Sequence, residues 1–243
     1  MQHQALKDLY SNEDDPQVQE EDFLEATDHL LDALMEHLDD CGTIIKCLSP
    51  DPNSKEHSRN QRKFKQAIKP YKNHIGKIVN HIKHNQGRLR PVKVSWPGNA
   101  VIGYFVEGPF GDNGVGPESS IHKDDHRGFS VNRDFPFHLC QVHSVSRNLV
   151  QTLRGMSPEL RAVKPLATLE KQARWIDCLT EASGLDNYYF PWELNEPKPL
   201  INITSQAVRI EYPSKRTRIP KLPPQVRYSM AYAGDNFTRS YRF

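Results

Sequence analysis

Apolar side chains recur at helical spacing in one central stretch of the chain, residues 71–90. Four of them fall at positions i, i+3, i+4 and i+7, the pattern of one buried stripe on an amphipathic α-helix: Ile75, Ile78, Val79 and Ile82. At about 100° per residue, Asn80 and His84 lie away from this stripe and one turn apart, so their side chains can meet. The pattern therefore predicts a helix with one core face and one face of Asn, Lys and His residues.

The same period predicts further helices before and after this stretch. We expect these helices at about 20–42, 55–69, 134–155 and 168–183. Gly42 should end or kink the first of them, and the alternative is that Ile44 and Ile45 continue it. Pro70 lacks a backbone N–H, so it should break or kink the chain and separate the second helix from the helix that follows it.

The helical period disappears between residues 91 and 130. The run AVIGYFV at 100–106 is rich in β-branched and aromatic residues, which predicts one strand of a short antiparallel pair. The glycine-rich stretch at 108–117 has neither the GxGxxG nor the GxxxxGK[ST] order, so we interpret it as an exposed turn and not as a phosphate-binding loop. The runs at 200–203 and 207–212 are also typical of strands.

Together these patterns predict a mainly α protein: a helical bundle with a small β-hairpin insert and a β-containing C-terminal segment. We expect a disordered acidic arm at 1–19, the bundle at 20–183 with its β insert at about 91–130, and a basic, aromatic segment at 184–243.

Composition narrows the cellular setting. The longest apolar runs are only a few residues, so we predict no membrane-spanning segment. The N-terminus lacks a basic start followed by an apolar run, so we predict no signal peptide and a cytoplasmic location. The cysteines form no CxxC pair and are predicted to be free thiols: Cys41, Cys47, Cys140 and Cys178.

Charge is distributed unevenly along the chain. Residues 1–40 are strongly acidic, whereas residues 46–94 contain thirteen Lys and Arg against Asp51 and Glu56. Either an acidic helix packs against a basic helix and partly neutralises it, or a basic surface is available to phosphates. The C-terminal residues 209–243 interleave Arg with aromatic side chains, which suits either nucleic-acid binding or an extended tail over the protein's own surface or a second subunit.

Two groups of candidate site residues combine a histidine with cationic and other polar side chains. Asn80, Lys83 and His84 share the central helix, and the run RDFPFH places Asp134 directly after Arg133, four positions before His138. A histidine can take the proton of a ribose 2′-OH, while Arg or Lys stabilises the charge that develops on the phosphate.

Each group also has a structural interpretation. His138 falls on the apolar stripe that continues through Val142 and Val145, so a buried structural histidine is an equally good interpretation. The Asn, Lys and His of the central helix can equally form a solvated face. The ribonuclease hypothesis requires Arg133, His138, Asn80 and His84 to converge on one groove.

These motifs, N-x-x-K-H on the central helix and R-x(4)-H on the later one, resemble the HEPN superfamily. HEPN proteins are prokaryotic helical domains found in toxin–antitoxin and phage-defence loci, and their nuclease members use an R-x(4–6)-H motif at a dimer interface to cut RNA without metal. The resemblance covers about residues 20–183, and the strict motif is absent from the central helix. It implies a protein of a bacterial defence or toxin system, with endoribonuclease activity on RNA, a homodimeric state and no cofactor. The alternative is a non-catalytic dimeric interaction protein that binds a protein or nucleic-acid partner through its basic surface and C-terminal tail.

The run HKDDH contains residue types that bind metals: His122, Asp124, Asp125 and His126. One pentapeptide seldom supplies a complete coordination sphere, so a polar loop is the preferred interpretation.

Overall fold

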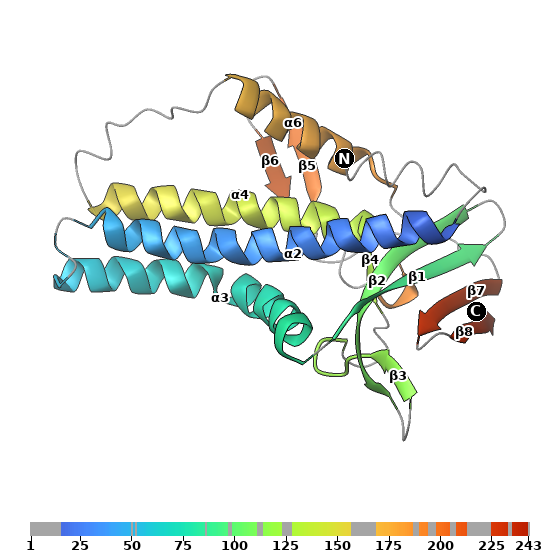
Figure 1. Cartoon of the computed structure of the whole chain (residues 1–243). Coiled ribbons are helices and arrows are strands. Elements are labelled where there is room, and N and C mark those ends of the chain that lie inside the picture. Colours follow the sequence, from blue (N-terminus) through green and yellow to red (C-terminus); the bar gives the residue numbers. More distant parts are fainter. Residues whose placement is uncertain are drawn as a thin grey trace.

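The computed structural model of the chain describes residues 16–49, 51, 53–85, 87–96, 99–110, 114–122, 128–156, 169–186, 190–193, 198–204, 208–212, 225–232 and 235–242. Its helices are α2 (Pro16–Cys47), α3 (Lys55–His84), α4 (Val131–Met156) and α6 (Leu169–Gly184), with a short 3-10 helix η1 (Pro191–Glu193). In Figure 1, α2, α4 and the first half of α3 run side by side, and each of these helices contacts the other two. The broad prediction of a mainly helical protein with an antiparallel strand region is confirmed.

The apolar stripes predicted from the sequence form the main core. Ile75, Ile78 and Val79 are buried on α3, and Ile82 packs at the edge of the same cluster. Leucines of α2 and the valine and leucine stripe of α4 complete this cluster. The periodicity identified these faces because each helix buries one side against two neighbours.

The predicted boundaries of α2 and α3 differ from the structure. α2 begins at Pro16, inside the predicted arm, and continues past Gly42 to Cys47, because Cys41 and Ile45 are buried on its core face. α3 is one helix with Pro70 inside it, where the sequence predicted two. The helix visibly bends in its middle (Figure 1), as expected where a proline removes one backbone hydrogen bond. Ser54 caps its start by accepting a hydrogen bond from the His57 backbone N–H at 3.0 Å.

The main sheet is larger than the predicted hairpin. Residues 100–106 lie in strand β2, as expected, and β2 pairs antiparallel with β1, so that Val92 faces Gly103. The C-terminal strand β7 joins the other side of β1, with Val92 opposite Met230. The strand order is β3-β2-β1-β7-β8, with β4 paired to β2. The strands are β1 (Leu89–Trp96), β2 (Asn99–Phe110), β3 (Gly114–Pro117), β4 (Phe129–Ser130), β7 (Gln225–Tyr232) and β8 (Asp235–Arg242).

The glycine-rich stretch is part of this sheet, so its prediction as an exposed turn was wrong at both ends. Gly108 and Gly116 are buried and face each other in the β2–β3 pair, while residues 111–113 lie outside the described residues. A second sheet consists of β5 (Leu200–Ile203) and β6 (Val208–Glu211), which confirms the two strands predicted there.

Gly103 positions the junction between the sheet and α4. A Cβ at this residue would lie 1.9 Å from the Phe129 carbonyl oxygen and 2.7 Å from the Phe190 ring. Only glycine therefore lets Phe129 of β4 and the Phe190 ring approach β2 this closely. As a result, the first turns of α4, the sheet and η1 meet at one buried point.

Candidate functional site

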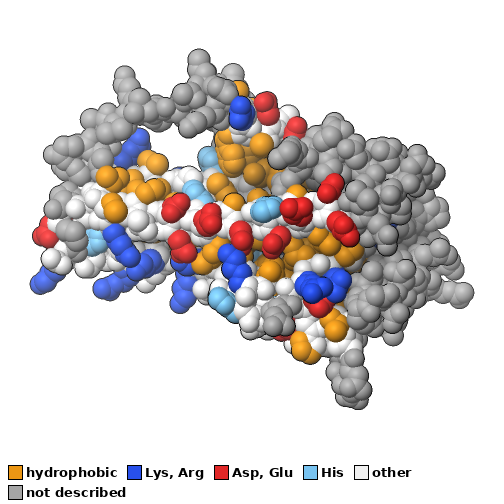
Figure 2. All heavy atoms as spheres, viewed as in Figure 1, with side chains coloured by type: hydrophobic (Ala, Val, Ile, Leu, Met, Phe, Trp, Pro, Cys, Tyr) orange, Lys and Arg blue, Asp and Glu red, His pale blue; other side chains and the backbone are white. Residues whose placement is uncertain are grey.

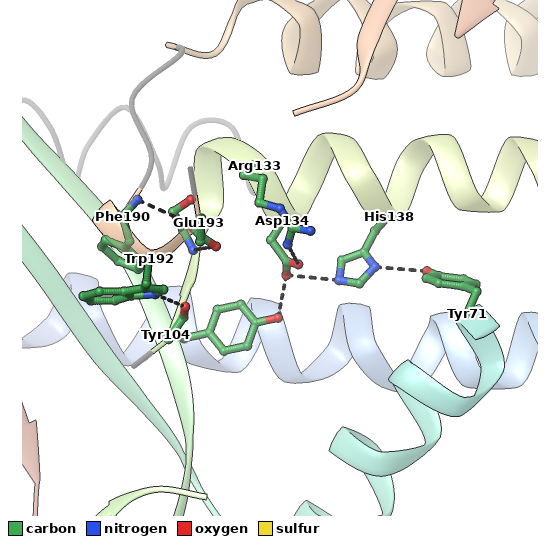
Figure 3. A network of polar contacts seen from close by, with 10 residues as sticks. Tyr71, Tyr104, Arg133, Asp134, His138, Phe190, Trp192 and Glu193 are labelled. Carbon is green, nitrogen blue, oxygen red and sulfur yellow. Dashed lines mark hydrogen bonds and ion pairs between the residues drawn. The ribbon is translucent and has the colours of Figure 1, made fainter. Parts of the chain in front are cut away.

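A buried polar network occupies the junction of α3, α4 and β2 (Figure 3). Asp134 and His138 lie one turn apart on α4, with His138 Nε2 3.1 Å from Asp134 Oδ2. The Tyr104 hydroxyl of β2 donates to the same carboxylate oxygen at 2.6 Å. The Tyr71 hydroxyl of α3 lies 3.1 Å from His138 Nδ1. The network therefore links three separate elements of the fold.

The proton positions follow from the chemistry of the partners. An ionised carboxylate can only accept, so His138 Nε2 carries hydrogen and donates to Asp134. Burial and the nearby Asp134 raise the pKa of Tyr71 well above its usual range, so its hydroxyl keeps its hydrogen where it meets His138 Nδ1. Both ring nitrogens of His138 are thus engaged, and the side chain is only 2% exposed.

Asp134 is ionised despite its burial. Burial alone would raise its pKa, but the charges of His138 and Arg133, together with the Tyr104 hydrogen bond, hold the pKa well below its usual range. Arg133 Nη1 lies 3.9 Å from Asp134 Oδ1, and the guanidinium stands 5.3 Å from the centre of the Phe137 ring. The arginine is therefore compensated inside the protein and is mostly withdrawn from solvent.

A second carboxylate, Glu193, ties η1 to the start of α4. Its two oxygens accept hydrogen bonds from the backbone N–H groups of Ser130 at 3.0 Å and Phe190 at 3.1 Å. Burial raises the pKa of Glu193 to about 7, against the opposing effect of Arg133 and these N–H groups. The neighbouring Trp192 indole donates to the Gly128 carbonyl at 2.8 Å. These contacts hold η1 against the residues that lead into α4, which is a structural role.

A small cavity of about 40 Å³ adjoins the network. Its walls are mainly apolar and come from α2, β2 and the first turns of α4: Phe23, Ala26, Thr27, Leu30, Tyr104, Val131, Asp134, Phe135 and His138. A space of this size holds a few water molecules but not a nucleotide. An RNA strand therefore has no room beside His138 in this conformation.

The structure does not bring the second predicted group to this site. Asn80, Lys83 and His84 are exposed on α3, and Lys83 forms an ion pair with Asp32 of α2 at 3.0 Å. Nine or more residues separate them from Tyr71 along the helix, which corresponds to about 14 Å or more of axial distance. Of the predicted site residues, Arg133, Asp134 and His138 therefore cluster, and the other three lie elsewhere.

The candidate metal run is only partly described. His122 is buried, and its Nε2 accepts a hydrogen bond from the Val106 backbone N–H at 2.9 Å, whereas Asp124, Asp125 and His126 lie outside the described residues. Within the described part of the chain, no three His, Cys, Asp or Glu side chains are placed to hold a metal ion. The four cysteines are free thiols, and burial raises the pKa of Cys140 to about 12, so this thiol is a poor nucleophile.

The first half of α3 carries a feature of a different kind, an exposed basic face. We define this face by the residues that line a shallow hollow of about 320 Å³: Ser58, Gln61, Arg62, Lys65, Gln66 and Lys69. The described residues that line it include no carboxylate. Figure 2 shows the Lys and Arg side chains near this end of the molecule, apart from the row of Asp and Glu along α2.

Sequence reasoning missed three members of the buried network: Tyr71, Tyr104 and Glu193. A weak signal existed for Tyr71, which lies four residues before Ile75 and so on the same buried stripe. Tyr104 lies within the predicted strand but gives no sign of its partner.

None of the described helices is both long enough and apolar enough to cross a bilayer. The HEPN resemblance stays a prediction, and the two regions above are the basis for a functional proposal. Neither the protein-family models, nor the curated proteins, nor the solved structures compared with this chain include a match.

Proposed function

We propose that this protein is a non-catalytic nucleic-acid-binding protein that holds a phosphate backbone on the basic face of α3. The observation that carries the proposal is a difference in pairing along one helix. In its second half, Lys72 and Lys83 form ion pairs with Asp39 and Asp32 of α2. In its first half, no carboxylate of the described residues pairs with a cation of the basic face.

The sequence of α2 explains this difference. α2 and α3 are antiparallel neighbours, so the first half of α3 lies beside the last turns of α2. Those turns read CGTIIKC from Cys41 to Cys47 and contain no acidic residue. The predicted pairing of an acidic with a basic helix therefore covers the second half of α3, and an exposed basic surface is left on the first half.

The side chains of the basic face suit phosphate groups. Arg62, Lys65 and Lys69 supply positive charge, while Ser58, Gln61 and Gln66 add hydroxyl and amide donors. Side chains of these types make most of the protein contacts to nucleic-acid backbones. Charge-assisted hydrogen bonds to phosphate are also stronger than those between neutral groups.

The buried network supports the non-catalytic part of the proposal. A general base must reach the proton that it abstracts, and both nitrogens of His138 are already engaged inside the protein. We therefore assign Arg133, Asp134 and His138 a structural role, in which they hold α4 against α3 and the sheet.

The proposal is tested by fluorescence anisotropy with a labelled 20-nucleotide RNA and its duplex over a range of salt concentrations. The triple variant Arg62→Gln/Lys65→Gln/Lys69→Gln should bind at least tenfold more weakly than the wild type. The slope of its log affinity against log salt concentration should be smaller than that of the wild type by about 2–3. The matched control Lys77→Gln/Arg88→Gln/Lys93→Gln has the same net charge and changes exposed residues outside the face. An equal loss in both variants, or no binding by the wild type, would contradict the proposal.

A HEPN-like ribonuclease of a defence or toxin system is the second candidate, favoured by one observation. Arg133, Asp134 and His138 of the R-x(4)-H match do lie together at one end of α4. Catalysis would require Tyr71 to release His138 and the junction to open. RNA cleavage by the wild type that Arg133→Ala abolishes, with helical content unchanged by circular dichroism, would favour this candidate. Sedimentation of the same sample would test the predicted homodimer.

A further inference from the structure

We infer that the ligand of the basic face is a nucleic-acid duplex and not a single strand. This inference rests on the proposed function and specifies its substrate class. The surface is the hollow of about 320 Å³ along the first half of α3, and the shared chemistry of RNA and DNA duplexes, two regular rows of phosphates, is what it would recognise.

The face offers cations without aromatic platforms. The Phe and Tyr residues of α3, Phe64 and Tyr71, are 2% and 5% exposed and belong to the core. Proteins that bind single strands without sequence preference combine a basic groove with aromatic side chains on which the bases stack. Among its described residues, the face offers unpaired bases no aromatic ring to stack on, whereas the bases of a duplex are already stacked on each other.

The spacing of the cations suits a regular, rigid ligand. Arg62, Lys65 and Lys69 follow one another at intervals of three and four residues, which places them about 5–6 Å apart along the helix axis. The whole face extends for about 16 Å, and a duplex presents about ten phosphate charges over that length. Several phosphates can therefore be contacted at once without bending either partner.

The face is also held rigid before any ligand arrives. Ser54 caps the start of α3, and Phe64 and Ile68 anchor its inner side in the core. Binding of a duplex to such a rigid helix orders few new degrees of freedom. A flexible single strand would lose conformational entropy on binding, and the buried aromatic rings of α3 could not offset that loss by stacking on its bases.

The experiment uses the full chain and five labelled probes at one salt concentration: a 20-base-pair RNA duplex, the same duplex with a scrambled sequence, a DNA duplex, the corresponding single RNA strand and a polyglutamate peptide. Both duplexes should bind at least fivefold more tightly than the single strand. The triple Gln variant of the basic face should remove this difference, and the matched control should keep it. A scrambled duplex sequence should change the affinity less than twofold, because phosphate contacts carry no sequence information.

Each contrary result has a distinct meaning. If the single strand binds as tightly as the duplexes, the duplex inference fails while the proposed function stands. If polyglutamate binds as tightly as the duplexes, the face recognises acidic protein, and both the inference and the proposed function fail. If no probe binds, the proposed function itself is wrong.

Discussion

Arg133 and Arg62 carry the same charge in two opposite settings. Arg133 lies in the buried network, next to an ionised carboxylate and over an aromatic ring. Arg62 lies on the exposed basic face, where the described lining residues offer it no carboxylate. Arg133 and His138 of the R-x(4)-H match both contact Asp134. The comparison teaches that burial and pairing decide whether an arginine stabilises the fold or is available to a ligand.

The largest expected effect is on the buried side of this comparison. Asp134→Ala leaves His138, Tyr104 and Arg133 without their common acceptor, which should cost about 3–5 kcal/mol of unfolding free energy in urea denaturation. The control Asp39→Ala removes an exposed carboxylate that pairs with Lys72 and should cost less than about 1 kcal/mol. Similar losses in the two variants would mean that the network is open to water in solution.

The pH dependence of stability sharpens the same contrast. The pKa of Glu193 is raised from 4.5 to about 7, so the folded protein binds its proton more tightly than the unfolded chain does. The contribution of this bound proton to the unfolding free energy is complete below pH 4.5 and is lost as the pH rises to about 7. The loss amounts to about 3 kcal/mol. Asp134, whose pKa is lowered, acts in the opposite sense and loses its contribution only below about pH 4.

The Glu193 prediction is checked by denaturation of the wild type and Glu193→Gln between pH 4.5 and 7. The wild type should lose stability over this window relative to the variant, which has no carboxyl group to titrate at this position. Parallel curves would show that Glu193 does not titrate there.

A smaller effect is expected from a single hydroxyl of the network. Tyr71→Phe removes the partner of His138 Nδ1 and should cost about 1–3 kcal/mol in the same denaturation assay. Tyr212→Phe is the matched control, because this residue is 48% exposed and its hydroxyl accepts a long, exposed hydrogen bond of 3.4 Å from Gln141. It should change stability by less than about 0.5 kcal/mol. If Tyr71→Phe is as mild as its control, the Tyr71–His138 contact does not form in solution.

The smallest effect on stability is expected on the basic face. Arg62→Gln should change the unfolding free energy by less than about 0.5 kcal/mol, because no buried partner is left behind. The same variant should lower the salt dependence of duplex binding by about 1 in the slope of log affinity against log salt. A large loss of stability would mean that Arg62, like Arg133, stabilises the fold, and the contrast between the two arginines would then be wrong.

Local sequence patterns correctly predicted the features that the geometry of a single helix determines. The stripe Ile75, Ile78 and Val79 was correct because its period is set by the helix itself, and Asp134 and His138 meet because they are one turn apart. The partners Tyr71 and Tyr104 lie 67 residues from His138 and 30 residues from Asp134, and no local pattern records such distances. The continuity of α3 through Pro70 was missed because packing of Ile68 and Tyr71 on either side outweighs the lost hydrogen bond.

The pairing of β1 with two very different neighbours has a consequence for the order in which the chain assembles. β2 follows β1 directly, so this hairpin closes a short loop, whereas β7 must return across more than a hundred residues to pair Val92 with Met230. Closing the longer loop costs more entropy and is expected later in folding. Until then, one edge of β1 is open to pairing with another chain. We expect pulse-labelled amide exchange to protect the β2 side of β1 before the β7 side; simultaneous protection would mean that the sheet forms in one step.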